Sequence, residues 1–350
     1  MPPESDGSLE PVPLPSRSRS RLWHRARAVY QQDRKAVRLV LIAVLLAWAA
    51  VGGFGVYRYA RSYWLYRGFR SPVEPTYTTT VGAKPERVHV EAGTVHTIRV
   101  WSSVVEPHDV STEVFLPPGY ASRPSRRYPV FYFLHGLPGE SFTYRTVLQG
   151  ETIEDVLIAQ RRMKPMIVVI PAGPWRTDTE WADRAGAGGG WDTFVARDLV
   201  RAIDRRFRTI RSVRARAIGG LSEGGYGALN IGLHHPNIFG VIESWSGYTL
   251  ADPRSGVFGK DPARLAYNSP LGVLPSVASE LRREHTYIWF YAGTADVYLI
   301  QNEEFAIELA RFGISHEFFS TAGGHSWPLW RRNIGWALIV ASDHMSHVSA

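Results

Sequence analysis

The sequence predicts a doubly wound α/β fold built on a mostly parallel sheet. Short continuous apolar runs, typical of strands covered on both faces, occur at residues 129–134 and 166–170. Segments with helical periodicity separate such runs along the chain, which is the pattern of a parallel sheet with helices on both faces. A strand, a glycine-rich turn and a helix follow one another within residues 215–236. These observations favour a sheet with a sharp strand-to-helix connection near its centre.

The individual elements follow in order from residue 97. Alternating apolar and polar residues predict half-buried strands at 97–101 and 111–116. Beyond the two apolar runs and the strand that opens 215–236, we expect strands at 240–244, 287–291 and 315–319. We expect helices at 150–161, 192–207, 302–312 and 327–342, besides the helix that follows the glycine-rich turn.

Composition excludes several classes of function. A chain of 350 residues has room for one large domain and an appendage. It has no cysteine, so a disulfide framework, a thiolate nucleophile and a zinc–thiolate site are excluded. Residues 1–70 hold 12 Lys and Arg against 4 Asp and Glu, a net charge of +8, whereas residues 71–350 hold 28 of each sign. The folded part therefore has no basic excess for nucleic acid.

The basic N-terminal part predicts a membrane anchor. Residues 1–38 are basic and rich in Pro, Ser and Arg, a composition typical of a disordered arm. Residues 39–57 carry no charge. Nineteen helical residues span about 28 Å, close to the thickness of a bilayer core. Eight Lys and Arg precede this stretch, so we expect a cytoplasmic N-terminus, a tether at 58–86 and an extracytoplasmic catalytic domain at 87–350.

Two other interpretations of residues 39–57 remain open. Ala47-Trp48-Ala49 fits the cleavage site of a signal peptide. The preceding basic region is too long for a signal peptide, and the apolar character continues past the site, so a retained anchor is favoured. A buried helix is the third interpretation.

The segment around Ser222 predicts a nucleophile elbow. Ser222 stands between glycines at 220 and 224, at the tip of the strand–turn–helix segment. Glycines are needed there because the serine adopts a strained backbone conformation and neighbouring side chains would collide with the strand and helix. The alternative is a tight glycine-rich turn without chemistry.

Candidate partners for Ser222 follow it in the order serine, acid, histidine. A serine needs a base to take its proton and a carboxylate to orient that base. His325 lies in a Gly-Gly-His-Ser-Trp loop before the last expected helix, and Asp296 follows the strand at 287–291. Asp296 could instead form only an Asx turn or a helix cap, in which case Glu303 or Glu304 is the fallback acid.

An oxyanion hole needs two backbone N–H groups aimed at the developing negative charge. We expect one from Glu223, directly after the nucleophile and at a helix N-terminus, and the other from Leu137, in the glycine-containing loop after 129–134. The sequence shows no metal-binding constellation and indicates no cofactor.

These motifs together resemble the Putative esterase family of α/β-hydrolases, which includes esterase D-like enzymes, feruloyl and acetylxylan esterases, enterochelin esterases and mycolyltransferases. The resemblance covers residues 90–342. The residues that carry it lie in LPPGY (116–120), LHGLPG (134–139), WDTF (191–194), GLSEGG (220–225), GTAD (293–296) and GHSW (324–327).

The resemblance implies an α/β-hydrolase fold, and the uncharged stretch at 39–57 predicts one transmembrane helix before it. It also implies Ser222 as nucleophile, Asp296 as acid, His325 as base and the amides of Leu137 and Glu223 as oxyanion hole. His135 and Trp327 are the candidates for contacting substrate. His135 stands where mycolyltransferases carry an aspartate. Glu223 replaces the methionine frequent in the family, and we expect its carboxylate at the mouth of the site to disfavour anionic substrates.

The predicted function is that of a membrane-anchored, extracytoplasmic serine esterase. It would hydrolyse a carboxylic ester through an acyl-enzyme, and its place at the bilayer suggests an envelope lipid or glycolipid as substrate. An acyltransferase of mycolyltransferase type would use the same triad with a sugar hydroxyl as acceptor. A non-catalytic hydrolase-fold interaction module is a second alternative. The expected partners are the acyl ester and the lipid bilayer, with no nucleic acid.

Overall fold

The computed structural model describes residues 39, 41–49, 52–53, 89–173, 179–184 and 189–347. The chain divides into two compact units, Met1–Gly68 and Phe69–Ala350. The predicted arm at 1–38 and tether at 58–86 lie outside the described residues, so these boundaries stay predictions.

In the first unit, the described residues of the predicted membrane span are helical. They are residues 39, 41–49 and 52–53, and the rest of the span 39–57 lies outside the described residues. Within the part of the chain that the structure describes, no helix combines the length and apolar character needed to cross a bilayer.

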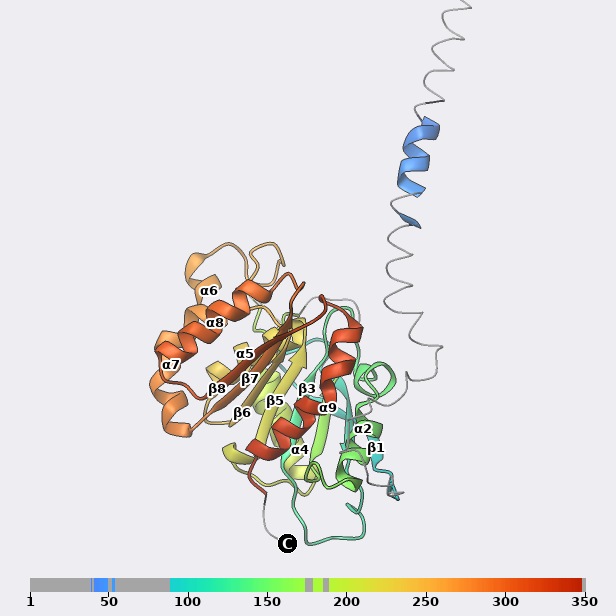
Figure 1. The fold of residues 1–350 in the computed structure, drawn as a ribbon, viewed down its shortest axis with the longest axis vertical. Coiled ribbons are helices and arrows are strands. Elements are labelled where there is room, and N and C mark those ends of the chain that lie inside the picture. The colour runs from blue at the N-terminus through green and yellow to red at the C-terminus, as the bar shows by residue number, and fades with distance from the viewer. Residues whose placement is uncertain are drawn as a thin grey trace, which may run out of the picture. The chain divides into compact units, whose positions relative to one another are not determined.

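The second unit is built on an eight-stranded sheet in the order β1-β2-β4-β3-β5-β6-β7-β8 (Figure 1). The first three strands in this order, β1, β2 and β4, pair antiparallel, and all pairs from β4 to β8 are parallel. The prediction of a mostly parallel sheet is therefore confirmed. The strands are β1 (Thr94–Trp101), β2 (Asp109–Leu116), β3 (Val130–Leu134), β4 (Ile167–Pro171), β5 (Arg216–Leu221), β6 (Val241–Trp245), β7 (Tyr287–Gly293) and β8 (His316–Thr321).

Helices cover both faces of this sheet. One buried cluster joins α2 and α9 to one face, and a second joins the segment from α3 to α4 with α5, α7 and α8 to the other (Figure 1). The helices are η1 (Thr143–Val147), α2 (Gly150–Ala159), α3 (Trp191–Thr193), η2 (Phe194–Leu199), α4 (Val200–Arg206), η3 (Val213–Ala215), α5 (Glu223–His234), α6 (Pro262–Tyr267), α7 (Pro270–Glu284), α8 (Leu299–Arg311) and α9 (Trp327–His344).

The short helices η1 and η3 and the α-helices α6 and α7 were not predicted. Helix α7 contains Pro270, Gly272 and Pro275 in its first two turns, residues with poor helix propensity that obscure its pattern. Helix α6 is short and has no buried residue, so it shows no apolar stripe. The apolar face of α7 packs against α5 and α8 and joins the buried cluster through Val273, Leu274 and Leu281 in spite of the prolines.

The order of the strands creates a topological switch point between β3 and β5. Strand β3 lies between β4 and β5, so the chain leaves β3 toward one side of the sheet and returns on the other. The chain therefore continues from β3 and from β5 to helices on opposite faces of the sheet, α2 and α5, and ligands of open α/β sheets bind at such a switch point.

Candidate active site

Ser222 occupies a strained turn at this switch point. It connects β5 directly to α5 with φ 56° and ψ −121°, a conformation that L-residues rarely adopt. A Cβ at Gly220 would lie 2.3 Å from the carbonyl oxygen of Leu134, and one at Gly224 would lie 2.1 Å from the same atom. The expected reason for both glycines is thus confirmed: the elbow packs against the end of β3 without room for a side chain.

The structure brings Ser222, His325 and Asp296 into one hydrogen-bonded chain. Ser222 Oγ lies 2.7 Å from Nε2 of His325. His325 Nδ1 lies 3.1 Å from Oδ2 and 3.3 Å from Oδ1 of Asp296. The loops after β5, β7 and β8 supply the three side chains, because parallel strands bring their carboxyl ends to one edge of the sheet. This is the arrangement that nucleophilic serine catalysis needs.

The carboxylate in this hydrogen-bonded series belongs to Asp296, whose side chain is buried. Burial alone would raise the pKa of Asp296, but the hydrogen bonds from His325 and from the amide of Tyr298 hold that pKa below its ordinary value. The carboxylate is therefore ionised at neutral pH, and it lies against Nδ1 of His325. The fallback acids Glu303 and Glu304 are exposed on α8, so the geometry favours Asp296.

Aromatic rings hold the imidazole of His325 from two sides. The ring of Trp330 lies 5.0 Å away at 88°, and that of Tyr298 lies 5.2 Å away at 79°. Trp327 is half-buried and packs on Trp330 at 5.1 Å. This places Trp327 one ring away from the imidazole, and its contact with substrate stays a prediction.

The loop after β3 approaches the elbow closely at Gly136. A Cβ there would lie 3.0 Å from Ser222 Cβ and 3.0 Å from the carbonyl oxygen of Leu221. Leu137 is the next residue, and helix α5 begins at Glu223 on the other side of the nucleophile. Amides of a first helical turn point out of the helix end. The two predicted oxyanion donors thus lie on segments that flank Ser222, and their role stays a prediction.

The prediction that His135 contacts substrate needs correction, because the side chain does not lie in an accessible position. It is buried, its Nε2 accepts a hydrogen bond from the amide of Gly173 at 2.9 Å, and its Nδ1 lies 3.1 Å from the Gly136 carbonyl. Burial lowers the pKa of His135 to about 4. The ring is therefore neutral at pH 7, and it connects the loop after β3 to the loop after β4.

Glu223 gives a second correction, since its carboxylate does not face the entrance of the site. The side chain is buried, and its Oε1 accepts hydrogen bonds from the amides of Thr179 and Glu180 at 3.2 and 2.9 Å and from the Thr179 hydroxyl at 3.0 Å. The backbone amide of Glu223 and its carboxylate therefore have separate roles. The side chain holds the segment 179–181 against α5.

This segment contains residues that sequence reasoning missed. Glu180 and Trp181 are buried with φ of 50° and 45°, and the hydroxyl of Tyr248 donates a hydrogen bond to Glu180. Tyr248 stacks on Tyr226 at 4.5 Å and lies 5.1 Å from Tyr298, which contacts His325. No sequence signal pointed to them, because the residues around Trp181 (Thr179-Glu-Trp-Ala-Asp-Arg184) are mostly polar and carry no spacing motif.

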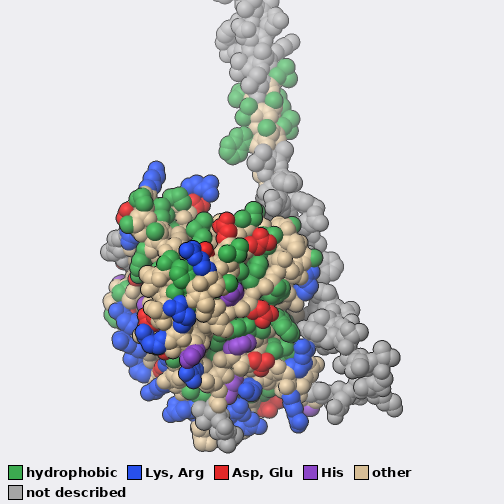
Figure 2. All heavy atoms as spheres, turned by 60° about the vertical axis from the view of Figure 1, so that its left-hand side comes forward, with side chains coloured by type: hydrophobic (Ala, Val, Ile, Leu, Met, Phe, Trp, Pro, Cys, Tyr) green, Lys and Arg blue, Asp and Glu red, His purple; other side chains and the backbone are tan. Residues whose placement is uncertain are grey.

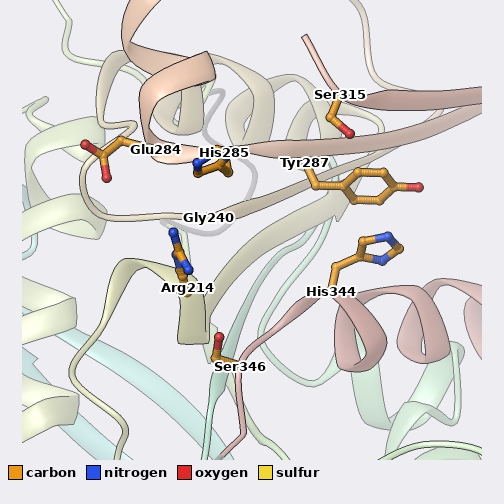
Figure 3. A pocket seen from close by; sticks show the side chains of 8 residues that line it. All are labelled: Arg214, Gly240, Glu284, His285, Tyr287, Ser315, His344 and Ser346. Atoms are coloured by element: carbon orange, nitrogen blue, oxygen red, sulfur yellow. The ribbon is translucent and has the colours of Figure 1, made fainter.

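A cavity of about 500 Å³ lies at the opposite edge of the sheet (Figure 3). It opens beside Gly240, Tyr287 and Ser315, at the amino ends of β6, β7 and β8. The rings of Tyr287 and His344 stack there at 3.6 Å. Because Ser222 follows the carboxyl end of β5, this cavity is not part of the candidate active site.

Several known proteins resemble this chain over much of its length. The family described as Putative esterase matches residues 103–339. An esterase of Mycobacterium tuberculosis is 27% identical over 247 residues, which cover 61% of this chain and 51% of that protein. An endo-1,4-beta-xylanase/feruloyl esterase of Xylanibacter ruminicola is 31% identical over 186 residues, 52% of this chain and 25% of that enzyme. This chain thus spans about half the length of the first of these relatives.

Among solved structures, a ferulic acid esterase has a similar fold. The TM-score is 0.65 with 24% identity, over 73% of this chain and 98% of that one. The likeness shows an α/β-hydrolase-like fold with a mostly parallel sheet.

Proposed function

The chain belongs to the Putative esterase family, and on that premise we propose that it is a serine esterase that cleaves a carboxylic ester through an acyl-enzyme on Ser222. The observation that carries the proposal is the continuous hydrogen-bonded chain from Ser222 Oγ through His325 to the buried Asp296. A buried, ionised aspartate can orient a histidine so that it takes the proton of the strained serine, which makes that serine a nucleophile.

The reaction would proceed in two displacements. Ser222 Oγ attacks the ester carbonyl carbon while its proton passes to His325 Nε2, 2.7 Å away. The carbon–oxygen bond to the alcohol breaks, and His325 gives that proton to the leaving oxygen. Water then attacks the acyl-enzyme, gives its proton to His325 and releases the acid, and the proton returns to Ser222 Oγ.

A fluorophosphonate probe tests the nucleophile. We expect the wild-type protein to be labelled and Ser222→Ala to lose both labelling and ester hydrolysis, with a decrease in kcat on the order of 10⁶. Ser320→Ala is the control, because Ser320 is exposed on β8 away from the elbow. A wild-type protein that is neither labelled nor active would contradict the proposal and favour a non-catalytic interaction module.

Transfer to a hydroxyl acceptor would share the same acyl-enzyme, so product analysis distinguishes it from hydrolysis. Turnover that is independent of an added sugar, with free acid as the sole product, supports the esterase. Accumulation of an acylated sugar supports an acyltransferase of mycolyltransferase type instead.

We further propose that residues 39–57 anchor the chain in a membrane, with the catalytic domain outside. The stretch is uncharged and follows eight Lys and Arg, and its described large apolar side chains are exposed, for example Trp48 at 75%. Anchoring at a bilayer would place acyl lipids or glycolipids of the envelope within reach of Ser222.

Membrane fractionation tests the anchor separately from the chemistry. Full-length protein should stay in the membrane pellet after alkaline carbonate extraction, and protease added outside intact cells should remove the catalytic domain. Deletion of residues 39–57 should release the protein. Extraction of the full-length chain by carbonate, or protection of the domain from external protease, would contradict this placement.

A further inference from the structure

Four large apolar side chains remain exposed on the loops that carry the candidate site. They are Leu137 after β3, Leu250 after β6, and Val297 and Ile300 after β7. Val297 is 78% exposed, Ile300 68% and Leu250 43%. Figure 2 shows apolar side chains among charged ones at the upper end of the catalytic domain. This is the end at which α6 lies in Figure 1. Contiguous exposed apolar surface of this kind marks binding sites more often than it occurs by chance.

Leu250, Val297 and Ile300, which lie on the segments that follow the neighbouring strands β6 and β7, are named here the apolar rim. The amide and hydroxyl of Thr249 bind the side-chain and backbone oxygens of Gln301 at 3.0 and 3.3 Å. These bonds bring Leu250, the next residue, beside the first turn of α8, where Ile300 lies. Val297 directly follows Asp296, so the rim begins at the triad itself.

The rim lies on the side of Ser222 where an alcohol must leave. Strands β6 and β7 lie between β5 and β8 in the sheet, so the loops that carry the rim follow strands that separate those of Ser222 and His325. Tyr298, between Val297 and Ile300 in sequence, packs its ring 5.2 Å from the imidazole. Since His325 must give its proton to the leaving oxygen, the alcohol part of a bound ester lies next to His325.

Charged side chains flank this surface, among them the exposed Glu303 and Glu304 one turn after Ile300 on α8. Asp252 and Arg254 flank it in the loop after β6, and they pair with each other at 2.8–3.0 Å. Apolar side chains that lie against an alkyl or aryl group remove both from water.

We infer that the apolar rim of Leu250, Val297 and Ile300 binds the alcohol part of the substrate, so that the enzyme selects esters of apolar alcohols. The inference rests on the proposed esterase function. It assigns the rim to the leaving group and leaves the acyl group to the other side of Ser222.

Two isomeric esters test it with the full-length protein. Hexyl acetate carries its alkyl chain on the alcohol, and methyl heptanoate carries the same chain on the acyl group. Each is compared with methyl acetate, below its solubility limit, by the acid released. Wild-type kcat/KM should be higher for hexyl acetate than for methyl acetate by about tenfold or more. Ile300→Gln and Val297→Gln should each reduce this preference by roughly tenfold, without a matching change in the preference for methyl heptanoate.

Ile307→Gln is the matched control. Ile307 is 66% exposed on the same helix as Ile300, about 10 Å further along it at 1.5 Å per residue. It should keep the wild-type preference. Exposed positions of this kind tolerate polar residues, so all three variants should fold.

The possible outcomes separate the two proposals. Rim variants that leave the preference for hexyl acetate unchanged, or that reduce only the preference for methyl heptanoate, overturn the inference while the esterase stands. Rim variants that change only binding to lipid vesicles also overturn it, because they assign the rim to membrane docking. A wild-type protein that hydrolyses none of the three esters and resists the fluorophosphonate probe overturns the proposed function as well.

Discussion

Substitution of Gly136 by alanine tests how the candidate oxyanion hole is built. The new Cβ would lie 3.0 Å from Ser222 Cβ, 3.0 Å from the Leu221 carbonyl oxygen and 2.8 Å from Leu221 Cδ1. The leucine side chain can rotate, but the other two atoms belong to the elbow, so the loop must retreat. Contacts of a real Cβ begin near 3.4 Å, and 3.4 minus 3.0 gives a shift of about 0.4 Å.

A shift of this size is enough to weaken transition-state stabilisation. Oxyanion donors act at about 2.7–3.1 Å, and losing one costs about 10²–10³ in kcat. Because the Leu137 amide follows Gly136 directly, we expect Gly136→Ala to lower kcat by about 10² with little change in KM. Steady-state kinetics on methyl acetate measures this, and circular dichroism verifies the fold.

Gly272→Ala separates this effect from loss of stability. A Cβ at Gly272 would lie 2.7 Å from the Ala266 carbonyl oxygen, a tighter backbone clash, at the start of α7. It should lower Tm and leave kcat unchanged. If folded Gly136→Ala keeps kcat within about twofold of wild type, the loop after β3 does not supply an oxyanion donor, and the assignment of Leu137 is wrong.

Three further predictions concern buried ionisable groups. Burial raises the pKa of Glu243 well above its ordinary value, so the folded protein binds a proton that the unfolded chain releases above about pH 4.5. The free energy of unfolding should then fall with rising pH, by at most about 1.4 kcal/mol per pH unit. Urea titrations at pH 5 and pH 8 measure this fall. Glu243→Gln should abolish it, whereas the control Glu303→Gln should keep it. Glu223→Ala removes an acceptor of three hydrogen bonds and should lower the free energy of unfolding by about 3 kcal/mol; wild-type stability in urea would show that these bonds contribute nothing. Burial lowers the pKa of His235, but the hydrogen bond and charge of Asp192 raise it by more, so the net shift is upward. This pair should therefore stabilise the fold below about pH 6.5 and lose its contribution as pH rises through the raised pKa. Asp192→Asn should flatten that change in thermal melts between pH 6 and 8.

The parts of the site that follow strand ends could be predicted from the sequence. In a parallel sheet the end of each strand fixes where the next loop begins, so chain order alone places Ser222, Asp296 and His325 at one edge. The glycines beside Ser222 were equally predictable, because a strained turn between a strand and a helix leaves no space for a Cβ. The helices α6 and α7 were not, since neither shows an apolar period that overrides its prolines and short length.

Side-chain direction could not be predicted, and both corrections at the site come from it. A histidine and a glutamate beside a nucleophile suggest contact with substrate. In the structure His135 instead binds the Gly173 amide, and Glu223 binds the segment 179–181. These partners lie in loops far away in sequence, without a spacing motif that relates them to the elbow.

The two corrected residues suggest why polar side chains stand at these positions. The loop after β3 and the segment 179–181 must both lie close to Ser222, yet neither contains a helix or strand that would fix it through backbone bonds. His135 supplies an acceptor to the Gly173 amide, and Trp181 Nε1 donates to the His135 carbonyl at 3.0 Å. Glu223 supplies an acceptor to three donors of the segment 179–181. Buried polar groups of this kind are costly to leave unpaired, so they hold the loops to one arrangement. The rigidity of the site therefore depends on side chains that do not take part in its chemistry.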